Sequence, residues 1–220
     1  MYRVLQLLTD AEVEECRRIA ATAQFVHGRI TNPHNKAKQN EQLHQPQAHQ
    51  KSSQLLLQAF GRSEEFREFA FPTMIAPPMI TRYQPGMHYG AHADAPFIQL
   101  QAGLLRSDLS CTVFLSEPES YEGGALHITL GNAEMEFKLP PGYAIVYPSD
   151  TLHQVVPVTR GERLVAITFI QSHISDPFKR TLLFNLNEVA ALEGLNMQPE
   201  NFTRLQLVQS QLLRHWSLAG

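Results

Sequence analysis

The sequence has few cysteines, no excess of charge of one sign and no long hydrophobic run. Its 220 residues carry 18 basic and 21 acidic side chains, so the formal net charge is −3. A chain so nearly balanced has no strong field for nucleic acid or for an anionic membrane surface. No apolar stretch approaches the roughly 20 residues of a membrane-spanning helix. The composition thus indicates a globular protein without a polymeric or membrane partner.

The two cysteines, Cys16 and Cys111, lie far apart in the chain without any C-x-x-C spacing, one in a helical and one in a strand-like context. These contexts favour two buried thiols, and a disulfide is the alternative. Residues 1–8 lack the apolar core and the small-residue cleavage site of a signal peptide. We therefore expect a cytoplasmic protein.

Helical patterns dominate the first third of the chain. Residues 9–24 open on a Thr-x-x-Glu capping box and continue with apolar residues at helical spacing. Residues 53–60 and 64–70 show the same spacing, and Pro72 ends it. Between the first helical pattern and the second, residues 29–51 are rich in Asn, Gln, Lys and His. This composition predicts a long polar loop or an edge hairpin rather than core. Composition alone does not show whether this segment gates a site.

From residue 79 to about residue 173 the chain consists of short β-rich runs separated by turn residues. The runs are Met79–Tyr83, Met87–Asp94, Leu109–Leu115, Ala125–Leu130, Glu134–Leu139, Tyr143–Tyr147, Leu152–Val158 and Arg163–Gln171. Closely spaced strands without helical patterns between them favour a sandwich or jelly roll over a parallel α/β sheet. The predicted fold is mainly β with flanking helices (α+β), a double-stranded β-helix of the jelly-roll or cupin-like type.

The last part of the chain returns to helical patterns. Ser175-Asp176-Pro177 supplies a capping residue followed by proline in the first turn. A second amphipathic segment begins near Asn201, and its apolar stripe is Phe202, Leu205, Val208, Leu212 and Trp216. Such helices cover either the barrel or a second subunit, so a homo-oligomer through them is one expectation. The predicted division is an N-terminal region of helices and polar loop (1–77), a jelly roll (78–174) and a C-terminal helical extension (175–220).

His92-Ala93-Asp94 is the first candidate for a functional site. Residues two apart in a strand point to the same face, so His92 and Asp94 can both project into a barrel. Two imidazoles and one carboxylate on one face of iron(II) leave three coordination positions open for oxygen chemistry. The tripeptide by itself is a weak signal, and a solvated aspartate beside a surface histidine is the alternative.

His153 and Arg163 give this tripeptide its context. His153 lies near the start of an apolar run and is a candidate third ligand, although a core histidine bonded to a backbone carbonyl would look the same. Arg163 follows ten residues later at the head of another apolar run. Burying a guanidinium is costly unless an anion pairs with it, which a dicarboxylate cosubstrate chelating the metal at its other end would supply. A surface arginine just after a turn is the alternative.

The combination resembles the iron(II)/2-oxoglutarate dioxygenases of the prolyl/lysyl hydroxylase type, and among these the bacterial PKHD-type hydroxylases. The resemblance covers nearly the whole chain, including the C-terminal helical extension. Besides H-x-D, the distal histidine and the arginine, it rests on Arg82-Tyr83, on residues 109–116, on Tyr121-Glu122-Gly123-Gly124 and on Tyr147-Pro148-Ser149.

The resemblance implies roles for particular residues. It implies that His92, Asp94 and His153 bind iron(II) and that Arg163 binds the distal carboxylate of 2-oxoglutarate. Tyr83 resembles a tyrosine that helps to hold the same carboxylate, with a core aromatic residue as the alternative. The resemblance further implies L-ascorbate as a reductant that rescues oxidised iron, and an association of the group with iron uptake.

The expected activity is hydroxylation of an unactivated C–H bond, coupled to decarboxylation of 2-oxoglutarate to succinate and CO2 with consumption of O2. Asp94 favours hydroxylation because related halogenases lack this carboxylate. A non-catalytic metal-binding module would have no use for Arg163, and a mere scaffold would have no use for intact ligands. No residue selects between a peptide and a small-molecule substrate. His88 shares the strand parity of His92 and is expected in the pocket wall, not as a ligand.

Overall fold

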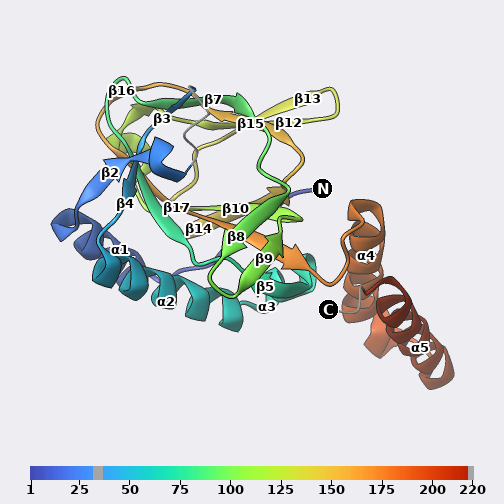
Figure 1. Cartoon of the computed structure of the whole chain (residues 1–220). Helices are drawn as coiled ribbons and strands as arrows, with labels where there is room; N and C mark the ends of the chain where they lie inside the picture. Colours follow the sequence, from blue (N-terminus) through green and yellow to red (C-terminus); the bar gives the residue numbers. More distant parts are fainter. Residues whose placement is uncertain (32–36, 218–220) are drawn as a thin grey trace.

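Two antiparallel sheets face each other in the computed structural model, which describes residues 1–31 and 37–217 (Figure 1). The larger sheet has eight strands, and β5 (Pro72–Ile75) pairs with its strand β17 outside the main path. In spatial order, the main path is β1 (Arg3–Gln6), β14 (Tyr143–Pro148), β10 (Leu109–Phe114), β17 (Arg163–Ser172), β6 (Met79–Tyr83), β4 (Glu41–Leu43) and β2 (Phe25–His27).

The smaller sheet has five strands, in the order β13 (Ala133–Phe137), β12 (Leu126–Leu130), β15 (Leu152–Val155), β7 (His88–His92) and β3 (Lys38–Gln39). Two short ribbons complete the β structure: β8 (Phe97–Leu100) with β9 (Gly103–Arg106), and β11 (Glu122–Gly123) with β16 (Val158–Arg160). The helices are α1 (Asp10–Thr22), α2 (Pro46–Arg62), α3 (Glu64–Ala70), α4 (Pro177–Glu193) and α5 (Pro199–Trp216). Short 3-10 turns span Gly28–Thr31, Pro118–Ser120 and Gly194–Asn196.

The core has two parts because the strands of the larger sheet are apolar on both faces. Helices α1, α2 and α3 cover the outer face (Figure 1), where Cys111 and Val146 join the helices' buried residues in one cluster. On the inner face, Phe114 and Tyr147 pack with residues of the smaller sheet. The inner cluster therefore packs between the two sheets, and several of its residues also line a cavity that both sheets border.

The predicted mainly β architecture with helices at both ends is confirmed, and each strand predicted between residues 79 and 171 is present. The capping box of α1 forms, with the Thr9 side chain accepting from the Glu12 amide and the Glu12 carboxylate accepting from the Thr9 amide. Asp176 caps α4 as expected. Cys16 and Cys111 are free and buried.

The polar segment 29–51 departs from its prediction. It was expected outside the core, but Lys38, Asn40 and Gln42 are only 5%, 2% and 2% exposed. The segment forms β3 and β4, which extend the smaller and the larger sheet respectively, and α2 begins already at Pro46. Its polar side chains are buried because β3 pairs with β7 and β4 pairs with β6. The amino-acid composition of the segment does not predict this pairing. Residues 32–36 of this segment lie outside the described residues.

In the residues that the structure describes, no helix is both long and apolar enough to cross a membrane. The cytoplasmic location and the division of the chain at residues 77 and 174 stay predictions. At the C-terminal end, α4 packs against α3 and α5 packs against α4, and both helices lie beside the sheets (Figure 1).

Candidate metal centre

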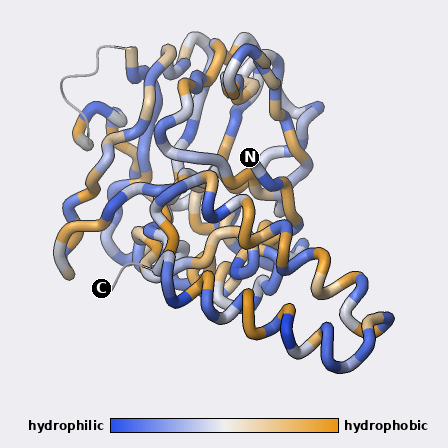
Figure 2. Tube along the Cα trace, turned by 90° about the vertical axis from the view of Figure 1, so that its right-hand side faces the viewer, coloured by the Kyte–Doolittle hydropathy of each residue, from blue (hydrophilic) through white to orange (hydrophobic). Residues whose placement is uncertain are grey.

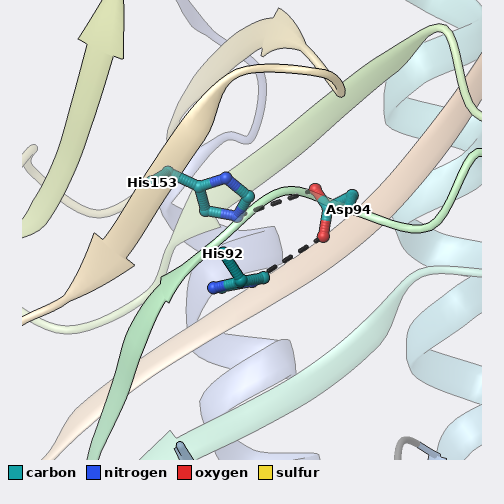
Figure 3. Close-up of side chains that lie close together, drawn as sticks. All are labelled: His92, Asp94 and His153. Carbon is teal, nitrogen blue, oxygen red and sulfur yellow. Dashed lines mark ion pairs between the residues drawn. The ribbon is translucent and has the colours of Figure 1, made fainter. Parts of the chain in front are cut away.

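Three side chains from neighbouring strands of the smaller sheet converge at one point (Figure 3). His92 ends β7, His153 lies directly opposite it on β15, and Asp94 follows β7 by two residues. The Nε2 atoms of His92 and His153 lie 3.9 and 3.6 Å from the Asp94 carboxylate oxygens. One ligand atom from each residue lies within 4.8 Å of the others, a grouping that could hold a metal ion. The structure thus brings together the three predicted ligands.

A β-bulge on β7 decides which of its side chains reach the cavity. His153 is opposite His92, whereas Val155 is opposite Tyr89, so β7 carries one extra residue between these pairs. Tyr89 consequently stacks on His92 with 3.6 Å between ring centroids and lines the cavity. The expectation that His88 lines the pocket wall is wrong, because the bulge shifts the strand parity on which it relied: His88 is not among the described lining residues.

Hydrogen bonds orient both histidines so that Nε2 is presented toward Asp94. The Nδ1 atom of His92 lies 2.8 Å from the Gly90 carbonyl oxygen, and that of His153 lies 3.0 Å from the Thr151 carbonyl oxygen. A carbonyl accepts only from a protonated nitrogen, so the proton of each neutral ring resides on Nδ1. Burial, assisted by the neighbouring His153, lowers the pKa of His92 to about 4. Near neutral pH, His92 therefore offers an unprotonated nitrogen to a metal.

A chain of serine hydroxyls holds Asp94 from the side of the larger sheet. Ser110 on β10 donates to Asp94 Oδ2 at 2.5 Å, and its oxygen lies 2.8 Å from Ser149 Oγ. Ser107 donates to Ser149 at 2.9 Å. This support was not foreseen from the sequence. The available signal was the alternation of Ser110 and Thr112 with apolar residues in a strand that is buried on both faces.

Replacing Ser110 with alanine is expected to weaken metal binding by about 10- to 100-fold, because outer hydrogen bonds fix the orientation of a ligating carboxylate. Titration with iron(II) or cobalt(II) under anaerobic conditions measures this. The matched variant Ser107→Ala removes a hydroxyl two bonds farther along the same chain and should change the affinity less. Equal affinity in Ser110→Ala and wild type would contradict a supporting role for this hydroxyl.

Arg163, the predicted carboxylate partner, is buried with only 1% of its surface exposed. Its guanidinium lies 4.9 Å from the ring centre of Tyr83 and 5.6 Å from that of Phe114. Within the described residues it forms no ion pair, and its Nε has no hydrogen-bond partner. The alternative of a surface arginine is therefore wrong. The guanidinium borders the same cavity as the three converging side chains, and a guanidinium buried without an anion is energetically costly.

Tyr83 is both a core residue and a wall of the cavity, so the two alternatives drawn from the sequence are compatible. It lies opposite Arg163 in the pairing of β6 with β17 and is 3% exposed. Its hydroxyl oxygen accepts a hydrogen bond from the Asn40 amide at 3.0 Å. That bond uses only a lone pair of the Tyr83 oxygen. The Tyr83 hydroxyl can therefore still donate a hydrogen bond to an acceptor in the cavity.

The cavity has walls from both sheets, and its lining includes Lys38 and Asn40 from the segment predicted to lie outside the core. The Lys38 ammonium lies 5.5 Å from the ring centre of Tyr89. Burial lowers the pKa of Lys38 to about 8, although the negative charge of Asp94 opposes the shift. Sequence reasoning missed both residues because nothing in a Gln- and Asn-rich segment marks which polar side chains point inward.

Comparison with known proteins defines the class first. Residues 78–171 match the family model described as the 2OG-Fe(II) oxygenase superfamily. In its fold the chain resembles a prolyl-4-hydroxylase from Pseudomonas putida, with a TM-score of 0.53 and 21% identity over 77% of this chain and 92% of that one. A prolyl hydroxylase from Trichoplax adhaerens has a TM-score of 0.55 and 14% identity over 82% and 86% of the two chains. These likenesses confirm the double-stranded β-helix, and the class confirms an oxidoreductase.

Closer relatives define the family. A PKHD-type hydroxylase of Sphingopyxis alaskensis is 59% identical over 216 residues, which are 98% of this chain and 99% of that relative. Another from Thermosynechococcus vestitus is 37% identical over 221 residues and 99% of each chain. The chain belongs to the PKHD-type hydroxylases, a family whose class uses Fe(II) and 2-oxoglutarate. The resemblance inferred from the motifs is thereby confirmed.

Proposed function

We propose that this protein hydroxylates an unactivated C–H bond of a primary substrate and couples this reaction to the conversion of 2-oxoglutarate and O2 into succinate and CO2. The observation that carries the proposal is Arg163, which is buried without an ion-pair partner among the described residues and borders the same cavity as the three converging side chains. A protein that only stored or sensed a metal would have no use for a buried cation aimed at an anion.

The residues present fit iron(II) and its cosubstrate. In the proposed arrangement, Nε2 of His92, Nε2 of His153 and the Asp94 carboxylate hold the metal, a donor set typical of non-haem iron(II) oxygenases. Arg163 would pair with the distal carboxylate of 2-oxoglutarate, which a guanidinium can bind in bidentate fashion. The Tyr83 hydroxyl, whose oxygen already accepts from Asn40, would donate a hydrogen bond to the same carboxylate.

When bound, Fe(II) and 2-oxoglutarate supply the activation of dioxygen that C–H hydroxylation requires. The chain's own side chains prepare the site for it. His92 is uncharged near neutral pH, so no proton has to leave it before a metal binds. With three protein ligands, a bound iron(II) would keep coordination positions for the cosubstrate and O2, and Asp94 would be the carboxylate ligand that favours hydroxylation over halogenation. Leu126 and Val155 contribute to an apolar wall that limits water in the cavity.

The primary substrate is a peptide or a small molecule. The family name supports a prolyl or lysyl residue of a peptide, and the group's association with iron uptake supports an iron-chelating small molecule. We include that association, and L-ascorbate as the reductant that restores Fe(II), in the proposal on the basis of the family resemblance. The possible homo-oligomer through the C-terminal helices belongs to the proposal as well.

An anaerobic titration tests the function directly. With Fe(II) bound, addition of 2-oxoglutarate should produce the weak visible charge-transfer band of a chelated keto acid. Absence of that band in a protein shown to contain the metal would refute the cosubstrate assignment. Candidate peptides and iron chelators can then be screened for stimulation of succinate formation, which identifies the class of primary substrate.

A further inference from the structure

Large apolar side chains are exposed on one face of α4. Phe178 is 73% exposed, Leu182 45%, Val189 48% and Leu192 72%. Successive residues of a helix are rotated by about 100° around its axis. Residues at alternating spacings of four and three therefore lie along one stripe of the helix. Together with Asn185, which takes the place between Leu182 and Val189, these residues form such a stripe. We call these five residues the α4 stripe.

The α4 stripe is not the face by which α4 joins the rest of the protein. That face carries the buried residues Leu183 and Phe184, and Phe184 meets Phe69 of α3 with ring centroids 5.5 Å apart. Toward α5, Asn187 accepts a hydrogen bond from Gln209 at 2.8 Å. At about 100° per residue these contacts lie on the opposite side of the helix from the stripe. Figure 1 shows both helices projecting from the body of the molecule, and in Figure 2 hydrophobic and hydrophilic residues alternate along the projecting part of the chain.

The spacing and composition of the α4 stripe are those of a helix that pairs with a like helix. Apolar residues repeat with the heptad pattern over the whole length of α4. The single polar member, Asn185, occupies the central position. One asparagine within an apolar heptad seam lowers stability but fixes register and oligomeric state, because it is satisfied only opposite another polar group.

We propose that the α4 stripe binds the α4 stripe of a second copy of this chain, antiparallel, around a twofold axis that passes near Asn185. Stripe residues at the same or nearly the same number of residues from Asn185 then meet across the axis. Phe178 lies opposite Leu192 of the second copy, and Leu182 lies opposite its Val189. Such an interface is isologous, so both copies contribute the same surface and the assembly closes as a dimer.

Charge favours the antiparallel over the parallel arrangement. Lys179, near the start of α4, and Glu193, at its end, are both exposed and flank the stripe on the same side. In the antiparallel dimer each Lys179 lies near Glu193 of the other copy, which gives two opposite-charge pairs. The helix dipoles are also opposed in this arrangement. In a parallel pair Lys179 would lie at the same end of the seam as the second Lys179, and the dipoles would be aligned.

Sedimentation of the full chain over a range of concentrations tests the dimer. The wild type should show a monomer–dimer equilibrium, and Leu182→Glu should raise the dimer dissociation constant at least tenfold, because it would bury a charge in the seam. Leu207→Glu is the matched control: Leu207 is 56% exposed on α5 and lies outside the stripe, so the equilibrium should not change. A wild type that stays monomeric, or a dimer that Leu182→Glu leaves intact, would overturn the proposal.

Disulfide trapping tests the orientation. Separately tagged Phe178→Cys and Leu192→Cys variants, mixed and oxidised, should form a mixed disulfide-linked dimer, and the native Cys16 and Cys111 do not compete because both are buried. Linkage of Phe178→Cys mainly to itself would overturn the antiparallel arrangement. The charge reversals Lys179→Glu and Glu193→Lys should each weaken the dimer, and the double variant should restore it. None of these measurements requires metal or cosubstrate, so their outcome is independent of the proposed reaction.

Discussion

Arg163→Leu is expected to raise the dissociation constant for 2-oxoglutarate by at least about 100-fold while leaving the affinity for Fe(II) unchanged. Losing one partner of a buried, hydrogen-bonded charge pair costs about 2–5 kcal/mol, and each 1.4 kcal/mol is a factor of ten in affinity. The metal is unaffected because Arg163 is not a member of the three-residue cluster. Anaerobic titration of the charge-transfer band measures cosubstrate binding, and calorimetry measures metal binding.

Two further variants separate this effect from a general disturbance. Arg160→Leu removes an exposed arginine of β16 that pairs with Glu122 at the protein surface, and cosubstrate affinity should stay that of the wild type. Arg163→Lys keeps a positive charge without the bidentate geometry, so it should recover part of the binding. If Arg163→Leu bound 2-oxoglutarate as tightly as wild type, the distal carboxylate would have to be held elsewhere.

Asp94→Ala is expected to abolish turnover, with succinate formation falling by at least about 1,000-fold. The substitution removes the only anionic member of the cluster and leaves the Ser110 hydroxyl without its acceptor. Loss of one of three ligands costs more than loss of an outer hydrogen bond, which is worth about 10- to 100-fold by itself. Metal content and succinate release under aerobic conditions are the measurements.

The matched control for Asp94 is Asp150→Ala, since Asp150 is an exposed carboxylate in the turn that precedes His153. Its removal changes the net charge equally and should leave metal content and turnover intact. Wild-type turnover in Asp94→Ala would show that the two histidines suffice and would contradict the three-ligand centre. Comparable loss in both variants would point to a general charge effect instead.

Strand alternation predicted the site well where the strands are regular. Residues two apart in a strand share a face, and this rule predicted His92 and Asp94 together, although Asp94 lies two residues beyond the end of β7. The same rule failed four residues earlier, because the bulge in β7 brings Tyr89 rather than His88 to the cavity. A bulge is set by the pairing of β7 with β15, and no residue of β7 alone announces it. The local sequence therefore predicted the three converging side chains but not all of the residues around them.

The N-terminal segments were harder to interpret for a related reason. β3 and β4 are two and three residues long, carry polar side chains and exist because longer strands offer them an edge. Lys38 and Asn40 are buried by that tertiary pairing, not by their own hydrophobicity. The role of Arg163 was predictable because an arginine that enters an apolar strand is costly to bury unless an anion pairs with it. The sequence thus predicts the role of a residue that is costly to bury, such as Arg163. It does not predict the position of residues such as Lys38 and Asn40, which are buried only through tertiary pairing.

The two halves of the proposed site belong to different sheets. His92 and His153 come from the smaller sheet, whereas Arg163 comes from the larger one, and the inner apolar cluster with Phe114 keeps the sheets apart. In the proposed binding mode the cosubstrate spans this gap. The distance between the two sheets therefore determines how long a keto acid must be to contact both the metal and Arg163. A shorter keto dicarboxylate could reach the metal or Arg163 but not both. Core packing between the sheets would then determine cosubstrate specificity in addition to stabilising the fold.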